Sequence, residues 1–154
     1  MEKKPELQLL TFECRLNQPF EKVAGGFDVE LFRALCPAFP RIRIRRFDGI
    51  REGDLVQLEM NFLLFTWQWN GRVESYRYSE DELCFVDSGQ KLPPFLAFWR
   101  HEHRVNRNAD GCTITDAIEF LPGKAWPEFL VRQMIRMQMK PRKEIYRNYF
   151  GKMV

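Results

Sequence analysis

Alternation of apolar and polar residues with a period of two dominates this sequence between residues 41 and 120. It is clearest in VQLEMNF (56–62), where every second residue is apolar. The same pattern is found in RIRIRRF (41–47), FTWQWNGRVESY (65–76), LCFVDSG (83–89), FLAFWRHEHRV (95–105) and CTITDAIEF (112–120). Because successive side chains of a strand point to opposite faces, the pattern predicts strands covered on one side. Turn residues such as REGD (51–54) separate the segments, which favours an antiparallel sheet.

Helices are predicted only outside this stretch. Residues 7–16 form a candidate first strand, after which Pro19 and Asp28 can each begin a short helix. Trp126 to Phe150 carries apolar residues at helical spacing, and Pro141 should kink or divide that helix. At 1.5 Å per residue this helix would be about 37 Å long, enough to cross a whole sheet. The sequence therefore predicts an α+β fold.

Composition limits the kinds of protein that this chain can be. Its 154 residues are 45% hydrophobic and 29% charged, which suits one compact domain spanning residues 1–154. The net charge of +3 is too small to indicate nucleic-acid binding without a concentrated patch. MEKKPELQLL lacks the apolar core of a signal peptide, and no run of about 18 apolar residues follows, so a cytoplasmic protein without a membrane span is expected. The four scattered cysteines are expected to be buried free thiols.

A longer motif adds a resemblance to a known family. FVDSGQKLPPFLAFWRHEHRV followed by DGCTITDAIEFLPG resembles the pattern F-x-D … W-x-H-x-H … G-T-x-x-x-D-x-x-x-x-x-P-G of bacterial SRPBCC ligand-binding domains. The matching residues are Phe85, Asp87, Trp99, His101, His103, Gly111, Thr113, Asp116, Pro122 and Gly123, with Cys112 inserted after the glycine.

The order of elements is similar to the START/SRPBCC superfamily, the helix-grip fold of the birch pollen allergen, over nearly the whole chain. This resemblance implies a curved antiparallel sheet of about seven strands wrapped around a long C-terminal helix, with two short helices after the first strand. It also implies a cavity between sheet and helix. Members of the superfamily bind lipids, hormones or polyketides, and some catalyse cyclisation, so the fold leaves the function open.

Both histidines of the chain lie two positions apart in FWRHEHRV (98–105), so in a strand they share one face. The opposite face carries Arg100, Glu102 and Arg104, which should leave the histidine face covered. A six-residue loop joining Val105 to Cys112 would place His101 opposite Asp116 and His103 opposite Ile114. Asp87 would come from the neighbouring strand, on the face of Phe85. The covered face of the sheet is thus expected to hold a group of polar side chains, His101, His103, Asp87 and Asp116, beside Trp67, Trp69 and Trp99.

Four interpretations of this group of polar side chains remain open. The group can be a buried polar network in which each carboxylate accepts from an N–H donor. It can be the polar end of an apolar pocket that orients a ligand. A dyad of His101 with Asp116 could act as a general base. Zinc could use the two histidines with a carboxylate, but no third histidine or nearby thiolate supports such a site, so neither a metal nor another cofactor is expected.

The combined expectation is that the chain binds a small hydrophobic or amphipathic molecule in an internal cavity. The three tryptophans and the flexible Met134 and Met137 would supply the apolar contacts. The alternatives are a cyclase- or dehydratase-like enzyme that uses His101 with Asp116, and a protein-interaction module. Arg41, Arg43 and Arg45 alternate on a strand with only Phe47 nearby for stacking, which argues against a nucleic-acid site. The family resemblance implies that this is an edge strand, so the arginines are interpreted as protection of that edge. The oligomeric state is left open.

Overall fold

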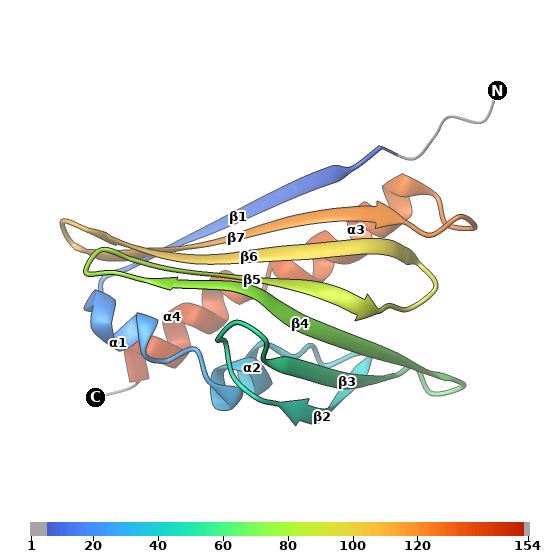
Figure 1. Ribbon diagram of the computed structural model, residues 1–154, viewed down its shortest axis with the longest axis horizontal. Coiled ribbons are helices and arrows are strands. Elements are labelled where there is room, and N and C mark those ends of the chain that lie inside the picture. Colours follow the sequence, from blue (N-terminus) through green and yellow to red (C-terminus); the bar gives the residue numbers. More distant parts are fainter. Residues whose placement is uncertain (1–5, 153–154) are drawn as a thin grey trace.

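The computed structural model describes residues 6–152 of the chain. Within these residues an antiparallel sheet is followed by paired helices at the C-terminal end (Figure 1). The elements are β1 (Gln8–Leu16), α1 (Phe20–Ala24), α2 (Val29–Leu35), β2 (Arg41–Phe47), β3 (Leu55–Asn61), β4 (Thr66–Tyr78), β5 (Glu82–Lys91), β6 (Leu96–Asn108), β7 (Gly111–Pro122), α3 (Glu128–Met139) and α4 (Arg142–Lys152).

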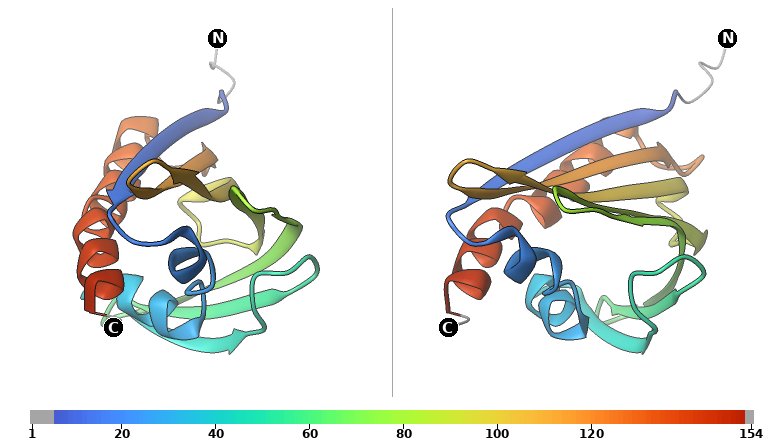
Figure 2. Two further views of the ribbon diagram at one scale, coloured as in Figure 1. Left: turned by 90° about the vertical axis from the view of Figure 1, so that its left-hand side faces the viewer. Right: turned by 60° about the vertical axis from the view of Figure 1, so that its left-hand side comes forward.

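The seven strands form one sheet in the order β1-β7-β6-β5-β4-β3-β2, and each neighbouring pair is antiparallel. The sheet curves strongly, so that α3 and α4 lie on its concave side while α1 and α2 lie near one end (Figure 2). This is the predicted helix-grip arrangement. The arginine-rich strand β2 lies at one edge of the sheet, as predicted.

The helices begin and end close to the predicted signals. The side chain of Asp28 accepts hydrogen bonds from the backbone N–H groups of Glu30 and Leu31, both at 3.0 Å, and so caps α2. The C-terminal helix is divided at Pro141 into α3 and α4, because proline has no N–H to continue the helical hydrogen bonds. The predicted start at Trp126 was two residues early, since α3 begins at Glu128 after Pro127.

The predicted register of the hairpin between β6 and β7 was wrong by two residues. Both strands continue to Asn108 and Gly111, which pair with each other, so the expected six-residue loop is a two-residue turn. The side chain of Asn108 accepts from the backbone N–H of Asp110 at 3.1 Å, and Gly111 has a φ of 151° that other residues rarely adopt. His103 is consequently opposite Asp116, and His101 is opposite Ile118. A shift of two residues keeps every side chain on its predicted face.

The buried apolar residues form two clusters. The first, called the α4 cluster here, joins α1, α2 and α4 to the sheet; its largest fully buried members are Phe20, Leu31, Leu83, Ile114, Tyr146 and Phe150. The second, called the α3 cluster, joins α3 to the sheet through Leu10, Phe95, Leu96, Ile118, Phe120, Val131, Ile135 and Met139. Partly buried aromatic and methionine side chains surround the α3 cluster, among them Trp67, Trp69, Trp99, Trp126 and Met134.

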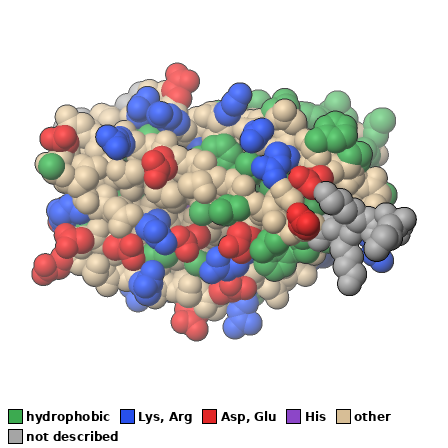
Figure 3. Space-filling model, turned by 90° about the horizontal axis from the view of Figure 1, so that it is seen from above, with side chains coloured by type: hydrophobic (Ala, Val, Ile, Leu, Met, Phe, Trp, Pro, Cys, Tyr) green, Lys and Arg blue, Asp and Glu red, His purple; other side chains and the backbone are tan. Residues whose placement is uncertain are grey.

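The outer surface carries charges of both signs. Seen from above, basic and acidic side chains are interspersed on the surface and no histidine is visible there (Figure 3). On β6, Arg100 lies 3.7 Å from Glu74 and 3.9 Å from Glu119. Cys14, Cys84 and Cys112 are buried, and all four cysteines are free thiols. Among the described residues, no helix is both long and apolar enough to cross a bilayer.

Candidate functional site

A cavity of about 420 Å³ lies between the concave face of the sheet and the helices. Most of its lining is apolar and comes from α2, from strands β2 to β6 and from α3; it includes Leu31, Phe32, Ile42, Leu58, Met60, Trp69, Trp99 and Met134. Two other lining residues, Phe39 and Met137, are 55% and 73% exposed, so they mark where the cavity opens to solvent. Its volume falls within the range typical of small-molecule sites.

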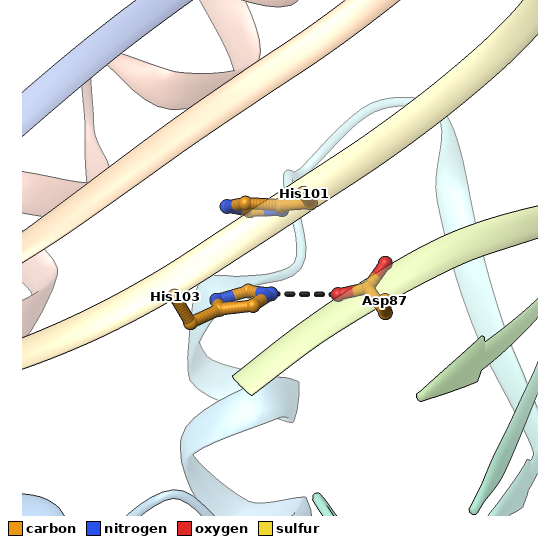
Figure 4. A group of neighbouring side chains, drawn as sticks. All are labelled: Asp87, His101 and His103. Carbon is orange, nitrogen blue, oxygen red and sulfur yellow. Dashed lines mark hydrogen bonds and ion pairs between the residues drawn. The ribbon is translucent and has the colours of Figure 1, made fainter. Parts of the chain in front are cut away.

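The polar groups of the cavity gather where β5, β6 and β7 run side by side. His101 and His103 point from β6 to the covered face, between Asp87 on β5 and Asp116 on β7. The two imidazole rings stack with their centres 3.7 Å apart, and Asp87 points at His103 (Figure 4). On its other side the ring of His103 stacks on Phe85 with the centres 4.4 Å apart. Three adjacent strands therefore hold these four polar side chains together.

Both carboxylates accept hydrogen bonds from the histidines. His101 Nε2 donates to Asp116 Oδ1 at 2.8 Å, and His103 Nε2 donates to Asp87 Oδ2 at 2.7 Å. The expectation that His101 and Asp116 are neighbours across two strands is met, although their bond runs diagonally because of the shifted register. His103 Nδ1 also lies 3.4 Å from Asp116 Oδ1. The result is a continuous network from Asp87 through His103 and Asp116 to His101.

The geometry assigns different protonation states to the two histidines. A carboxylate only accepts, so the carboxylates facing both ring nitrogens of His103 favour the imidazolium form, which donates twice. Burial would lower the pKa of His103, but its bonds with Asp116 and Asp87 raise that pKa above its usual value. Burial and the adjacent charge of His103 lower the pKa of His101 to about 4, against the opposing effect of Asp116. His101 is therefore neutral at pH 7, with its single proton on Nε2.

The two aspartates remain ionised despite burial. Burial alone would raise the pKa of Asp116, but hydrogen bonds from His101 and His103 together with the charge of Arg142 hold it well below its usual value. For Asp87, burial likewise opposes ionisation, and the bond and charge of His103 outweigh it, so that its pKa is lowered. When His103 is protonated, its imidazolium and the guanidinium of Arg142 balance the two carboxylates, and this end of the cavity is then neutral in sum.

Sequence reasoning missed two members of this site, both on α4. Arg142 Nη1 lies 3.6 Å from Asp116 Oδ1, and the buried hydroxyl of Tyr146 donates to Asp116 Oδ2 at 3.1 Å. Their spacing of four residues puts them on one face of the helix. That spacing follows the break at Pro141 and is visible in the sequence, but nothing in the sequence shows that this face meets β7.

The tryptophans do not all lie where they were expected. Trp69 and Trp99 line the cavity and meet edge to face, with ring centres 4.9 Å apart. Trp67 is not among the lining residues, because its ring packs among Phe62, Phe65, Phe95 and Trp126. Asp116 also lies behind the lining, covered by the histidines and by α4. The remaining expected site residues, Asp87, His101, His103, Met134 and Met137, all line the cavity.

Asp87, His101 and His103 are the described residues that could hold a metal ion. One ligand atom from each lies within 4.8 Å of the others. Both Nε2 atoms, however, are bonded to carboxylates, and the stacked rings lie nearly parallel, at 26°. Zinc ligands usually converge on a tetrahedral centre, so binding a metal here requires the network to rearrange. The expectation that no metal is required stays a prediction.

The arginine-rich edge borders a second hollow of about 620 Å³, which lies between α2 and the turn from β2 to β3 and adjoins the cavity. Several of its arginines are paired with nearby carboxylates. Arg46 Nε lies 2.8 Å from Asp48 Oδ1, and Arg45 is bonded to Glu59 on the adjacent strand. The local positive charge is thus reduced where the sequence alone shows a basic run.

Comparison with solved structures identifies the fold. Over 96% of this chain and 95% of the other, the protein is similar to the Zhui aromatase/cyclase from Streptomyces sp. R1128, with a TM-score of 0.68 and 12% identity. It is also similar to norcoclaurine synthase from Thalictrum flavum (TM-score 0.69, 10% identity, 96% and 88% of the two chains). A third similar structure is Ara h 8.0201 (TM-score 0.66, 16% identity, 94% and 98%).

No family model and no curated protein matches the sequence. The chain nevertheless has the helix-grip fold of START/SRPBCC proteins, as the order of its elements predicted. At these low identities the likeness establishes the fold alone, and the function has to be argued from the residues of the site.

Proposed function

We propose that this protein binds a small hydrophobic or amphipathic molecule in the cavity between its sheet and C-terminal helices. The observation that carries the proposal is an apolar cavity of about 420 Å³ with its polar groups gathered at one end. Ligand sites usually combine an apolar lining with a few polar groups that fix orientation. A cytoplasmic location, expected from the sequence, belongs to this proposal.

Binding of N-phenyl-1-naphthylamine, a neutral dye whose emission rises in apolar surroundings, tests the proposal. The dye should bind saturably to the wild-type protein. Trp99→Leu should weaken binding about tenfold, since it removes a broad aromatic contact from the cavity wall. Trp67→Leu is the matched control: it removes the same side chain one layer behind the lining and should change affinity less. No saturable binding to the wild type would contradict the proposal and favour an interaction module instead.

A second candidate function is a cyclase- or dehydratase-like enzyme that uses His101 with Asp116. Its specific support is the 2.8 Å bond between them, with His101 lining the cavity. Against it, a pKa of about 4 makes His101 a weak base at pH 7, whereas an efficient general base has a pKa near the working pH. Turnover of a screened polyketide-like substrate that is lost in His101→Ala and retained in Trp67→Leu would favour the enzyme.

A further inference from the structure

The four groups of the histidine–aspartate network differ in how far they reach the cavity. The side chains of Asp116 and His101 are 3% and 5% exposed, and that of His103 is 13% exposed. Asp87 is 25% exposed, the highest fraction of the four, and it lines the cavity. Its Oδ2 accepts from His103, whereas its Oδ1 has no hydrogen-bond partner among the described residues. Asp87 therefore presents an ionised oxygen atom to the cavity.

The histidines cannot offer donors to a ligand at this place. His103 Nε2 is hydrogen-bonded to Asp87, and His103 Nδ1 lies 3.4 Å from Asp116 Oδ1, so both ring nitrogens face carboxylates of the network rather than a ligand. His101 donates its single proton to Asp116, which leaves its Nδ1 as an acceptor. The histidines and aspartates therefore present acceptors to the cavity, whereas Arg142, which also lines it, carries the donors at this end. A ligand group that meets Asp87 must supply the hydrogen.

Charge balance decides which donor fits. The two carboxylates are matched by Arg142 and by His103 in its protonated form, which the carboxylates facing both of its ring nitrogens favour, so a neutral ligand preserves the balance at this end of the cavity. A ligand carboxylate could approach Arg142, but it would add an uncompensated negative charge beside Asp87 in a partly desolvated cavity, where unpaired charge is costly. A hydroxyl group supplies a hydrogen-bond donor without adding charge.

We infer that the cavity selects ligands that bring a neutral hydroxyl group, carried on an apolar ring or chain, to the free oxygen of Asp87, and that it discriminates against carboxylates. This inference rests on the proposed function and gives it a substrate class. The hydroxyl would donate to Asp87 Oδ1 while the apolar part lies against Trp69 and Trp99. A hydrogen bond to a charged group contributes about 1.5–3 kcal/mol, which corresponds to about 10- to 150-fold in affinity.

The test uses three probes of nearly the same shape, each displacing N-phenyl-1-naphthylamine from the wild-type protein at pH 7. They are 2-naphthol, 2-methoxynaphthalene, which accepts but cannot donate, and 2-naphthoate, which is anionic. We expect 2-naphthol to bind at least about tenfold more tightly than the methyl ether, with 2-naphthoate the weakest of the three. Because this comparison needs no variant, it does not depend on whether a substitution folds.

Two variants test whether Asp87 is the group that makes 2-naphthol bind more tightly than its methyl ether. Asp87→Asn retains an acceptor but removes its charge, so the advantage of 2-naphthol over the methyl ether should fall to about threefold or less. Glu102→Gln is the control: it removes a carboxylate from the opposite face of the same region, where Glu102 pairs with Arg104, and the advantage should be unchanged.

The outcomes separate this inference from the proposed function. Equal affinity for 2-naphthol and its methyl ether, or tightest binding of 2-naphthoate, overturns the hydroxyl inference while dye binding still supports a ligand cavity. An unchanged preference in Asp87→Asn assigns the hydroxyl to another group and also overturns it. If neither the dye nor any probe binds, the proposed function fails, and this inference fails with it.

Discussion

The α4 cluster and the α3 cluster use large side chains in opposite ways. In the α4 cluster three large rings are fully enclosed and lie outside the cavity lining: Tyr146 is 1% exposed, and Phe20 and Phe150 are 1% and 0% exposed. Leu31 and Phe85 of the same cluster line the cavity. Beside the α3 cluster, Trp69 and Trp99 are only partly buried, and both line the cavity. Protein interiors are normally packed without large voids, so an unfilled apolar cavity forgoes stabilising contacts. The difference indicates that the enclosed rings of the α4 cluster stabilise the fold, while the partly buried rings beside the α3 cluster leave room for a ligand.

Shortening a ring in the α4 cluster should produce the largest loss of stability. Phe150→Ala removes a fully buried ring that contacts Tyr149 and Tyr146, so the free energy of unfolding should fall by about 3–5 kcal/mol. Met134→Ala removes a side chain that already borders the cavity, and it should cost less than about 1.5 kcal/mol. Urea unfolding measures both changes. Equal losses would show that the two clusters are packed alike.

The two aspartates extend this comparison to the polar residues. Asp116→Asn removes the anion that binds His101 and Tyr146 and balances Arg142, so it should lower the free energy of unfolding by about 3 kcal/mol at pH 7. Asp87→Asn should cost about 1 kcal/mol, because the Asp87 side chain has one hydrogen-bond partner within residues 6–152 and borders the cavity. Chemical denaturation of both variants provides the measurement. A larger loss for Asp87→Asn would mean that Asp87 supports the fold more than it serves a ligand.

Most of the fold could be predicted from sequence periodicity, and the one error in strand register has a physical cause. Alternation identified the faces of β3, β4, β6 and β7, and Pro141 identified the division of the C-terminal helix. The register of the last hairpin was wrong because Asn108 to Gly111 can form a tight turn as well as belong to a longer loop. A shift of two residues leaves every side chain on the same face of its strand, so the prediction still placed His101 and His103 on the covered face.

The site residues that lie on neighbouring strands could be predicted from the sequence. The residues whose positions depend on how the helices and rings pack against the sheet could not. Asp87, His101, His103 and Asp116 lie on neighbouring strands, and their grouping follows from faces and strand order. The position of Trp67 behind the cavity depends on how its ring packs against Phe95. Arg142 and Tyr146 depend on the rotation of α4 about its own axis. Sequence periodicity gives the apolar face of a helix but leaves its precise rotation open.

The stacked histidines should titrate far apart although they are chemically identical. Asp87 on β5, Asp116 on β7, and Arg142 and Tyr146 on α4 surround them. Nuclear magnetic resonance of the two imidazoles should find one, His103, protonating above the usual pH of about 6.5, and the other, His101, protonating only near pH 4. His103→Gln, which removes the adjacent charge, should raise the pKa of His101. Two titrations near 6.5 would contradict the bonded network.

The free energy of unfolding should depend on pH through both histidines, and the two dependences should have opposite signs. The contribution of His103 is fully present below its unfolded pKa and is lost as the pH rises through its raised folded pKa. His101 acts in the other direction: below about pH 6.5 the unfolded chain takes up a proton that the folded protein accepts only near pH 4, so stability falls across that interval. The aspartates contribute above their unfolded pKa and lose their contribution as the pH falls through their lowered folded pKa. Unfolding curves of the wild type and His101→Gln between pH 4 and 8 measure the contribution of His101 to the pH dependence of stability.

The smallest effect on stability is expected at the mouth of the cavity. Met137 is 73% exposed although it belongs to the lining, so Met137→Ser should change the free energy of unfolding by less than about 0.5 kcal/mol. Binding of N-phenyl-1-naphthylamine should weaken by only about two- to threefold, since an exposed side chain removes little extra apolar surface from water. Trp99→Leu, deeper in the wall, is the reference for a full contact. If Met137→Ser weakens binding as strongly as Trp99→Leu, then α3 must cover the mouth when a ligand is present, and the exposed methionine belongs to the ligand site rather than to its entrance.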